Sequence, residues 1–259
     1  MQKLISIDLK ADFGFFRKPD ANAGINLSYN MLHKPALLGI LGAVIGLEGY
    51  KELGKMPEYY EKLKSLQIGI EPLGHEKGNY SKTVIKYSNT VGYANKGTNY
   101  LTEEATLIAP AYRCYILLNT EDEYQKKMYE YLKAGKAEFL PYFGKNEFSA
   151  WWETENGGFK EYAFEVDKER TESFKIKTLF KKNIKTLQSQ KEENIFDLFN
   201  LDNTEATYLY FERLPTGFDE TLNQYKLDEF AFTPFKIKSN SDIKNLYRLK
   251  SENYYVQLI

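Results

Sequence analysis

Polar and apolar residues alternate along residues 3–16, at the start of the chain. Ile5, Ile7 and Leu9 would point to one side of an extended chain, and the polar residues between them would point to the other. This period of two predicts an amphipathic β-strand that buries its aliphatic face.

The most apolar stretch of the chain predicts a helix over residues 35–47. Pro35 suits the first turn of a helix, because the N–H that proline lacks would have no partner there. Glycines recur along one side of this helix, within a sector of about 80°. They are Gly39, Gly42, Gly46 and Gly49. One side would therefore be nearly bare backbone, which predicts close packing, above all against the sheet of the same domain.

Further elements follow in an alternating order. The patterns predict a short helix from about residue 57, extended segments at 67–72 and 82–91, an apolar strand at 112–118 and a helix that stops near Gly135. Thr120 and Glu123 match the capping box that begins a helix. The order of strand, helix, hairpin, strand, helix and strand predicts an α+β protein with a ferredoxin-like βαββαβ domain.

The pattern of predicted elements changes after Trp151. Short strand-like runs follow at residues 162–166, 174–180, 207–213 and 230–238. We therefore expect two parts, a ferredoxin-like domain at 1–165 and a smaller β-rich part at 166–259.

The composition excludes several kinds of chemistry. The 259 residues include one cysteine and two histidines, which leave no zinc or disulfide framework and little material for a Ser-His-Asp triad. We expect no cofactor and no metal. The longest apolar run is shorter than the roughly 20 residues that span a bilayer, and no apolar leader opens the chain, so we expect a cytoplasmic protein.

Lysines are distributed unevenly, although the net charge is only −1. Residues 77–102 contain four lysines, interleaved tyrosines and no acidic residue, and residues 173–191 contain six lysines and no acidic residue. Such segments suit nucleic-acid binding. They are equally typical of a solvated surface in a chain that uses lysine in preference to arginine.

The loop after the first strand carries residues suited to RNA. Phe16 could stack on a base, and Arg17 and Lys18 could hold a phosphate. The alternative is a β-bulge with Phe16 in the core. In the lysine-rich hairpin, Lys82 and Lys86 would lie on one face.

Two other loops have the same open interpretation. Asn30, His33 and Lys34 precede the glycine-rich helix, whose free N–H groups would favour an anion, but they also suit an ordinary helix start. Lys145 and Asn146 follow a glycine and are suited to a phosphate or a base edge, or to a plain turn.

Five motifs, taken in their order and spacing, resemble a known family. They are FRKP at 16–19, SYN at 28–30, KPALLGILGA at 34–43, PYFGKNEF at 141–148 and ERLPTGF at 212–218. Together they are similar to the fifth family of CRISPR-associated (Cas) proteins, above all to its type I-B branch. The resemblance extends over nearly the whole chain and is weakest in the lysine-rich middle.

The resemblance implies a domain of the repeat-associated mysterious protein (RAMP) type, with a projecting β-hairpin thumb at about residues 67–110. It implies a non-catalytic subunit of the Cascade surveillance complex in antiviral defence. Such a subunit holds the 5′ handle of the CRISPR RNA (crRNA), touches the backbone and large subunits, and meets target DNA only through the complex. The RNA contacts expected on this basis are Phe16, Arg17, Lys18, Asn30, His33, Lys34, Lys82, Lys86, Lys145 and Asn146.

Two alternatives remain at this point. One branch of the same family cuts repeat RNA without a metal, using Tyr, Lys and His, and His33-Lys34 is the only adjacent His-Lys pair in this chain. The other alternative is an assembly adaptor that binds only protein. The main interpretation assigns no catalytic residue.

Overall fold

The structure is a computed structural model. It describes residues 1–20, 24–89, 100–166, 170–182, 185–186, 199–200, 208–250, 252 and 254–259. Residues 90–99 of the first lysine-rich segment, and residues 183–184 and 187–191 of the second, lie outside this set.

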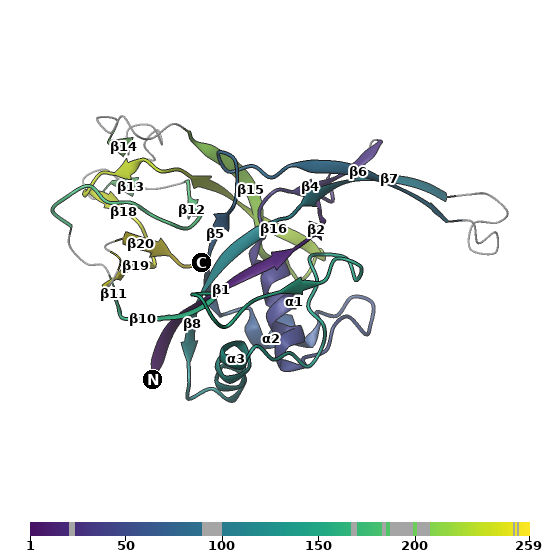
Figure 1. Ribbon diagram of the computed structural model, residues 1–259, viewed down its shortest axis with the longest axis horizontal. Helices are drawn as coiled ribbons and strands as arrows, with labels where there is room; N and C mark the ends of the chain where they lie inside the picture. The colour runs from purple at the N-terminus through teal and green to yellow at the C-terminus, as the bar shows by residue number, and fades with distance from the viewer. Residues whose placement is uncertain are drawn as a thin grey trace.

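The central sheet has the strand order β10-β1-β8-β5, with all pairs antiparallel (Figure 1). Its strands are β1 (Gln2–Ala11), β5 (Gln67–Leu73), β8 (Ala111–Asn119) and β10 (Phe159–Tyr162), with the short β9 (Ala150–Trp151) also beside β1. The helix α1 (Lys34–Ile45) and the short α2 (Glu58–Leu63) lie between β1 and β5 along the chain, and α3 (Glu123–Ala134) lies between β8 and β10. This is the ferredoxin-like order, so the predicted fold class is confirmed.

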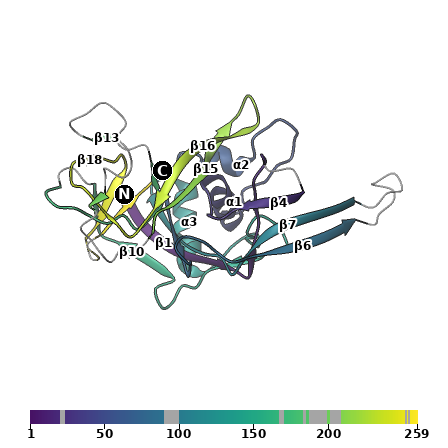
Figure 2. The same ribbon diagram turned by 90° about the horizontal axis from the view of Figure 1, so that it is seen from above.

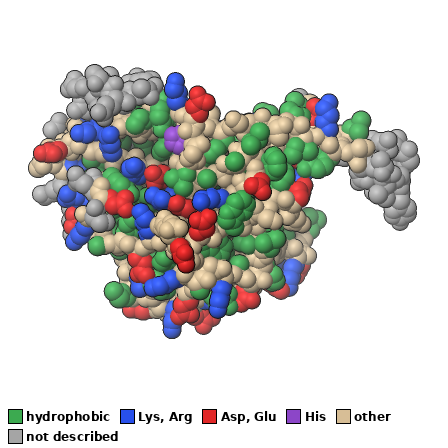
Figure 3. Space-filling model, in the orientation of Figure 1, with side chains coloured by type: hydrophobic (Ala, Val, Ile, Leu, Met, Phe, Trp, Pro, Cys, Tyr) green, Lys and Arg blue, Asp and Glu red, His purple; other side chains and the backbone are tan. Residues whose placement is uncertain are grey.

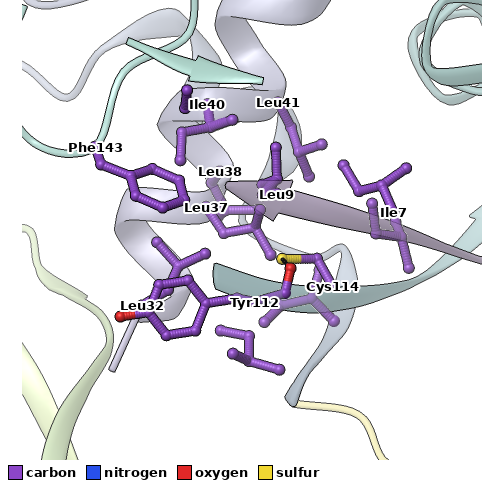
Figure 4. Packing of buried hydrophobic residues seen from close by; sticks show 14 of the residues in the cluster. Ile7, Leu9, Leu32, Leu37, Leu38, Ile40, Leu41, Tyr112, Cys114 and Phe143 are labelled. Carbon is purple, nitrogen blue, oxygen red and sulfur yellow. Dashed lines mark hydrogen bonds between the residues drawn. The ribbon is translucent and has the colours of Figure 1, made fainter. Parts of the chain in front are cut away.

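Helices cover one face of the sheet. Leu37 and Leu41 of α1 lie beside Leu9 and Cys114 of the sheet, and all four are fully buried (Figure 4). Cys114 is therefore a small core residue, as expected for a lone thiol. The described helices include none that is both long and apolar enough to cross a bilayer.

The glycines of α1 face a helix and not the sheet. A Cβ at position 42 would overlap the Cβ of Tyr59, and one at position 39 would lie 3.6 Å from the Tyr59 ring. Tyr59 belongs to the short helix α2 (Glu58–Leu63). Gly46 ends α1 in the left-handed conformation, with φ of +83°. Close packing is thus confirmed at Gly39 and Gly42, whereas a Cβ at Gly49 would meet no atom within 4 Å. The predicted partner was wrong, because the aliphatic side of α1 is the one that covers the sheet.

The start of α3 also differs from its prediction. Asp122 caps this helix by accepting the Gln125 N–H at 2.9 Å, while the Thr120 hydroxyl donates to the carbonyl of Met1. The capping box is therefore not formed. The predicted stop at Gly135 is confirmed, with φ of +64°.

The second face of the sheet is buried as well. Ser6, on the polar side of β1, is fully buried and hydrogen-bonds the Tyr162 hydroxyl at 2.9 Å. Leu4 and Tyr115 on this side pack with Val256. The covering strands are β19 (Leu246–Leu249) and β20 (Tyr254–Gln257), so β1 is buried on both sides rather than on one.

The thumb hairpin lies between β5 and β8. It is shorter than the expected range of about 67–110, because β5 pairs with β8 in the central sheet. Its strands β6 (Lys82–Asn89) and β7 (Tyr100–Ile108) pair antiparallel and run away from the body (Figures 1 and 2). Three early strands widen its base: β2 (Phe13–Gly14) and β4 (Ile25–Tyr29) pair with β7, and β3 (Phe16–Arg17) pairs with β4. The single strand predicted at residues 3–16 is thus split between two sheets.

The C-terminal part is built mainly of strands. These include a long hairpin of β15 (Tyr210–Asp219) and β16 (Gln224–Phe232), which packs on α1. The remaining strands are β11 (Phe164–Val166), β12 (Phe180–Lys181), β13 (Lys185–Thr186), β14 (Phe199–Asn200), β17 (Lys236–Ile237) and β18 (Ser241–Asp242). The run at 174–180 makes isolated bridges to β17 and β20, with β12 starting at its end. The domain boundary near residue 165 stays a prediction.

Candidate nucleic-acid interface

A groove of about 420 Å³ opens where the start of α1, β3 and the loop at 141–148 meet. Aromatic side chains line it, so we call it the aromatic groove: Phe15, Phe16, Tyr50, Tyr59, Phe218 and Tyr225. Two cationic residues, Arg17 and Lys145, also line it. Tyr50 is 60% exposed, and exposed rings beside cations are the combination on which single-stranded bases stack.

Gly144 fixes the loop on one side of the aromatic groove. Its φ is +83°, and a Cβ there would overlap the carbonyl of Phe15. Only glycine allows this approach. The Phe15 N–H accordingly donates to the carbonyl of Phe143 at 3.0 Å. The contact holds Lys145 at the edge of the groove.

Lys145 forms ion pairs with two carboxylates. Its Nζ lies 2.7 Å from Glu104 and 3.1 Å from Glu147, and 3.8 Å from the centre of the Tyr87 ring. Burial alone would lower the pKa of Lys145, but its hydrogen bonds to Glu104, Tyr87 and Glu147 raise that pKa overall. Lys145 is therefore charged but shared between two carboxylates. Asn146, next to it, is exposed.

Phe16 is not available to stack on a base. Its side chain is 3% exposed and packs edge-on against Tyr112 and His33. The prediction of a base-stacking Phe16 was wrong, because β3 turns alternate side chains to opposite sides and Phe16 takes the inner one. Arg17, the next residue, is exposed.

His33 caps α1 from inside the protein. Its Nδ1 accepts the Ala36 N–H at 3.3 Å, and the ring is 4% exposed. Burial lowers the pKa of His33 to about 3, so the ring is neutral near pH 7. His33 lies in the wall of the aromatic groove as a neutral aromatic ring, and the expected phosphate contact was wrong.

Lys34 points into the protein. Its Nζ donates to the main-chain oxygen of Ile259 at 3.0 Å, and the residue is 9% exposed. Burial, followed by the charge of Lys181, lowers the pKa of Lys34 to about 8. The prediction of an RNA contact by Lys34 was wrong, since its ammonium group lies between α1 and the C-terminal residues.

Asn30 and Glu212 form a buried polar cluster at the base of the thumb. Glu212 accepts the N–H groups of Asn30 and Met31 at 3.0 and 3.1 Å, and it pairs with Lys18 at 3.1 Å. The Asn30 Oδ1 accepts Lys82 Nζ at 3.1 Å. We call these residues the Glu212 cluster.

Three predicted RNA contacts thus meet in the Glu212 cluster. Asn30 is buried and bonded to the protein, so it was wrongly predicted to be free for RNA. Lys18 and Lys82 already have partners there. Burial lowers the pKa of Lys82, and Glu212 opposes this effect.

Lys86 stands apart from the aromatic groove. It pairs with Glu103 across the thumb at 2.7 Å, and its side chain is 75% exposed. Adjacent strand residues point to opposite faces, so Lys86 lies on the face opposite Tyr87 and Lys145. The sequence analysis expected all these residues to contact RNA, whereas the structure divides them among the aromatic groove, the Glu212 cluster and the outer face of the thumb.

Tyr50 and Tyr225 are members of the aromatic groove that the sequence analysis missed. They come from a loop after α1 and from β16, more than 170 positions apart in the printed sequence. No local pattern marks either residue. Among the described residues, no group of three His, Cys, Asp or Glu side chains is placed to hold a metal ion.

Comparisons with known proteins give structural likeness alone. No protein-family model matches the chain, and no curated protein matches it. A CRISPR protein from Archaeoglobus fulgidus, known from a crystal structure, is 12% identical with a TM-score of 0.47, over 98% of this chain and 97% of the other.

Two further similar chains come from larger assemblies. One, from a CRISPR RNA-guided surveillance complex, is 10% identical with a TM-score of 0.44, over 91% of this chain and 92% of the other. The second, from a type III-B Cmr-beta complex bound to cognate target RNA and AMPPnP, is 13% identical with a TM-score of 0.44, over 99% of both chains. The ferredoxin-like assignment above rests on the strand order of this chain itself.

Proposed function

We propose that this protein is a non-catalytic subunit of a type I CRISPR surveillance complex and that its aromatic groove holds the 5′ handle of the crRNA. The observation that carries the proposal is the aromatic groove itself, with the exposed Tyr50 ring and the half-buried Tyr225 ring, and with Arg17 and Lys145 in its lining, at the base of a projecting hairpin. Bases stack on such rings, and cations beside them bind the phosphates. The motifs that resemble the fifth Cas family contribute residues to this groove, which also supports the proposal.

The contact residues we propose differ from those expected from sequence. Arg17, Lys145 and Asn146 are retained, and Tyr50 and Tyr225 are added as stacking platforms. The other partners of the subunit would be the backbone and large subunits of the complex, with target DNA reached through the complex, in antiviral defence.

Crosslinking tests this function in the assembled complex. The chain is expressed with the backbone subunits and a crRNA that carries 4-thiouridine in its handle, and crosslinked peptides are identified. We expect crosslinks at Tyr50 or Tyr225 and their loss in an Arg17→Gln, Lys145→Gln variant. Lys133→Gln with Lys136→Gln is the control, because both lysines are exposed at the end of α3. Handle crosslinks that map outside the groove would contradict the proposal.

The non-catalytic assignment needs its own experiment. The purified chain is incubated with labelled repeat RNA in EDTA. We expect intact RNA, because His33, of the only adjacent His-Lys pair, is buried and neutral. Cleavage at one site would instead support the endoribonuclease alternative.

A further inference from the structure

A second groove, of about 430 Å³, lies in the C-terminal part. Five cationic residues line it, and we call it the basic groove: Arg170, Lys175, Lys177, Lys236 and Arg248. Two carboxylates, of Glu172 and Glu252, are the acidic groups of its lining, so the groove has a net charge of +3. Figure 3 shows several Lys and Arg side chains over this left-hand part of the molecule.

Backbone pairing turns two of the lysines outward. The Tyr255 N–H donates to the Lys175 carbonyl at 3.0 Å, and Phe174 exchanges two backbone hydrogen bonds with Ile237. In this extended segment Phe174 and Ile176 are buried, so Lys175 and Lys177 share the opposite face. Their spacing of roughly 7 Å is comparable with that of successive phosphates in an extended single strand.

The lysines of this groove are unneutralised. Within the described part of the chain, Lys175, Lys177 and Lys236 form no ion pair. By contrast, Lys18, Lys86 and Lys145 at the thumb each have a carboxylate partner. Unpaired ammonium groups in a concave surface concentrate positive potential and attract polyanions.

Aromatic rings complete the lining. Tyr254 and Tyr255 are half-buried, and the Nζ of Lys177 lies 5.0 Å from the centre of the Tyr254 ring. Glu252 is already engaged, since the Tyr254 hydroxyl donates to it and Lys160 lies 3.7 Å away. Cations with partly exposed rings are the combination that binds single strands without sequence preference.

We propose that the basic groove binds the sugar-phosphate backbone of a single-stranded nucleic acid. It is a site separate from the aromatic groove, because the two grooves share no lining residue. Lys175, Lys177 and Lys236 supply the phosphate contacts, and Tyr254 supplies a surface for a base. Arg170 and Arg248 add positive charge to the lining, although Arg170 donates to the carbonyl of Ser239 and Arg248 lies 3.6 Å from Glu165. This inference does not depend on the proposed function, because it concerns any single strand rather than the handle.

Salt-dependent binding tests the proposal. The full chain is titrated with labelled oligouridylate and oligodeoxythymidylate of about 16 nucleotides, and anisotropy is followed at several salt concentrations. The variant Lys175→Gln, Lys177→Gln, Lys236→Gln removes three phosphate contacts. We expect the salt slope to fall by about 2 and the affinity at about 0.1 M salt to fall about 100-fold. Replacing the same lysines by arginine should restore both.

The control variant is Lys126→Gln, Lys133→Gln, Lys136→Gln, which makes the same charge change on and after α3. A loss seen with both probes, or with one alone, supports the proposal and identifies RNA, DNA or either as the source of the strand. An unchanged salt slope, or an equal loss of affinity in the control variant, overturns the proposal. An acidic protein surface would then be the remaining partner for the basic groove. Handle crosslinks in the assembled complex should survive the basic-groove substitutions, so this test and that of the proposed function fail separately.

Discussion

The aromatic groove and the basic groove have similar volumes, but they differ in whether their lysines have carboxylate partners. In the aromatic groove and the thumb beside it, Lys145, Lys86 and Lys18 each lie within 3.1 Å of a carboxylate oxygen. In the basic groove, Lys175 and Lys236 have no carboxylate within ion-pair distance among the described residues. The first groove therefore offers rings with compensated charges, and the second offers free positive charge.

The difference shows that an acid-free sequence does not make an acid-free surface. Residues 77–102 contain no acidic residue, yet Lys86 of that segment pairs with Glu103, from the next strand. The segment at 173–191 also lacks acidic residues. Lys181 and Lys182 of that segment pair with carboxylates of β16, whereas Lys175 and Lys177 have no ion pair among the residues that the structure describes. Strand pairing decides which acidic side chains arrive opposite each lysine.

Gly144→Ala should cause the largest loss of stability. It would disrupt the aromatic groove and leave the basic groove intact. The new Cβ would overlap the Phe15 carbonyl at a φ of +83°, and we expect the free energy of unfolding to fall by about 4 kcal/mol. Urea unfolding measures the change. Gly74→Ala is the control, because it has φ of +62° but no atom within 4 Å, and it should cost about 1 kcal/mol. Equal losses would mean that the close approach at Gly144 has no energetic role.

Glu212→Gln comes next, since it removes the carboxylate that compensates Lys18. The change weakens hydrogen bonds from two buried N–H groups and breaks one ion pair, so we expect a loss of about 3 kcal/mol. Thermal unfolding at fixed salt measures it. Glu220→Gln, at an exposed pair with Lys64, should change stability by less than about 0.5 kcal/mol. A loss at Glu212 as small as that at Glu220 would refute a structural role for the cluster.

Acid should destabilise the protein through His33, which lies in the wall of the aromatic groove. Between pH 6.5 and about 3 the unfolded chain protonates His33 while the folded chain keeps it neutral. Stability therefore falls as pH decreases through that window, by about 2 kcal/mol at about pH 5. His33→Asn keeps an oxygen that can cap α1. This variant should lose much of the pH dependence of stability, as measured by urea unfolding near pH 7 and near pH 5. An unchanged slope in His33→Asn would mean that His33 is not the titrating group.

Lys86→Gln should have the smallest effect on stability and compares the two kinds of lysine directly. Its pair with Glu103 is exposed, so we expect no measurable loss of stability in urea unfolding. In the single-strand titration, Lys175→Gln should reduce the salt slope by about 0.7, and Lys86→Gln should reduce it by less. If Lys86→Gln gave the larger change, pairing would not predict which lysines bind nucleic acid.

Local patterns predicted the ferredoxin-like order, because period and turn signals lie within a few residues of each other. The thumb was expected from the family resemblance, and its second strand, β7, was not predicted from local pattern. The local patterns located α1 by Pro35 and its apolar run, and the end of α3 by Gly135. They failed where a distant segment decides the environment. Ser6 was placed on a polar face because nothing near it reveals that Tyr162 and the C-terminal strands cover that face.

The candidate site was less predictable than the fold for the same reason. Arg17 and Lys145, predicted in separate loops, line one groove, but Phe16, Asn30, His33 and Lys34 are buried. Phe16 and His33 become walls of the groove, and Asn30 and Lys34 bond to the protein itself. Residue type indicated chemistry suited to RNA, whereas only the tertiary contacts determine which of these side chains are exposed.

The Glu212 cluster also determines when the base of the thumb can fold during synthesis. The Asn30 N–H donates to the carboxylate of Glu212, which is synthesised 182 positions later in the chain. At translation rates of about 5–20 residues per second, that interval is roughly 10–40 s. A ribosome-bound chain that stops short of residue 212 has the complete thumb sequence but lacks the carboxylate that anchors its base. The thumb base is therefore among the last regions of the N-terminal domain to reach its final form on the ribosome.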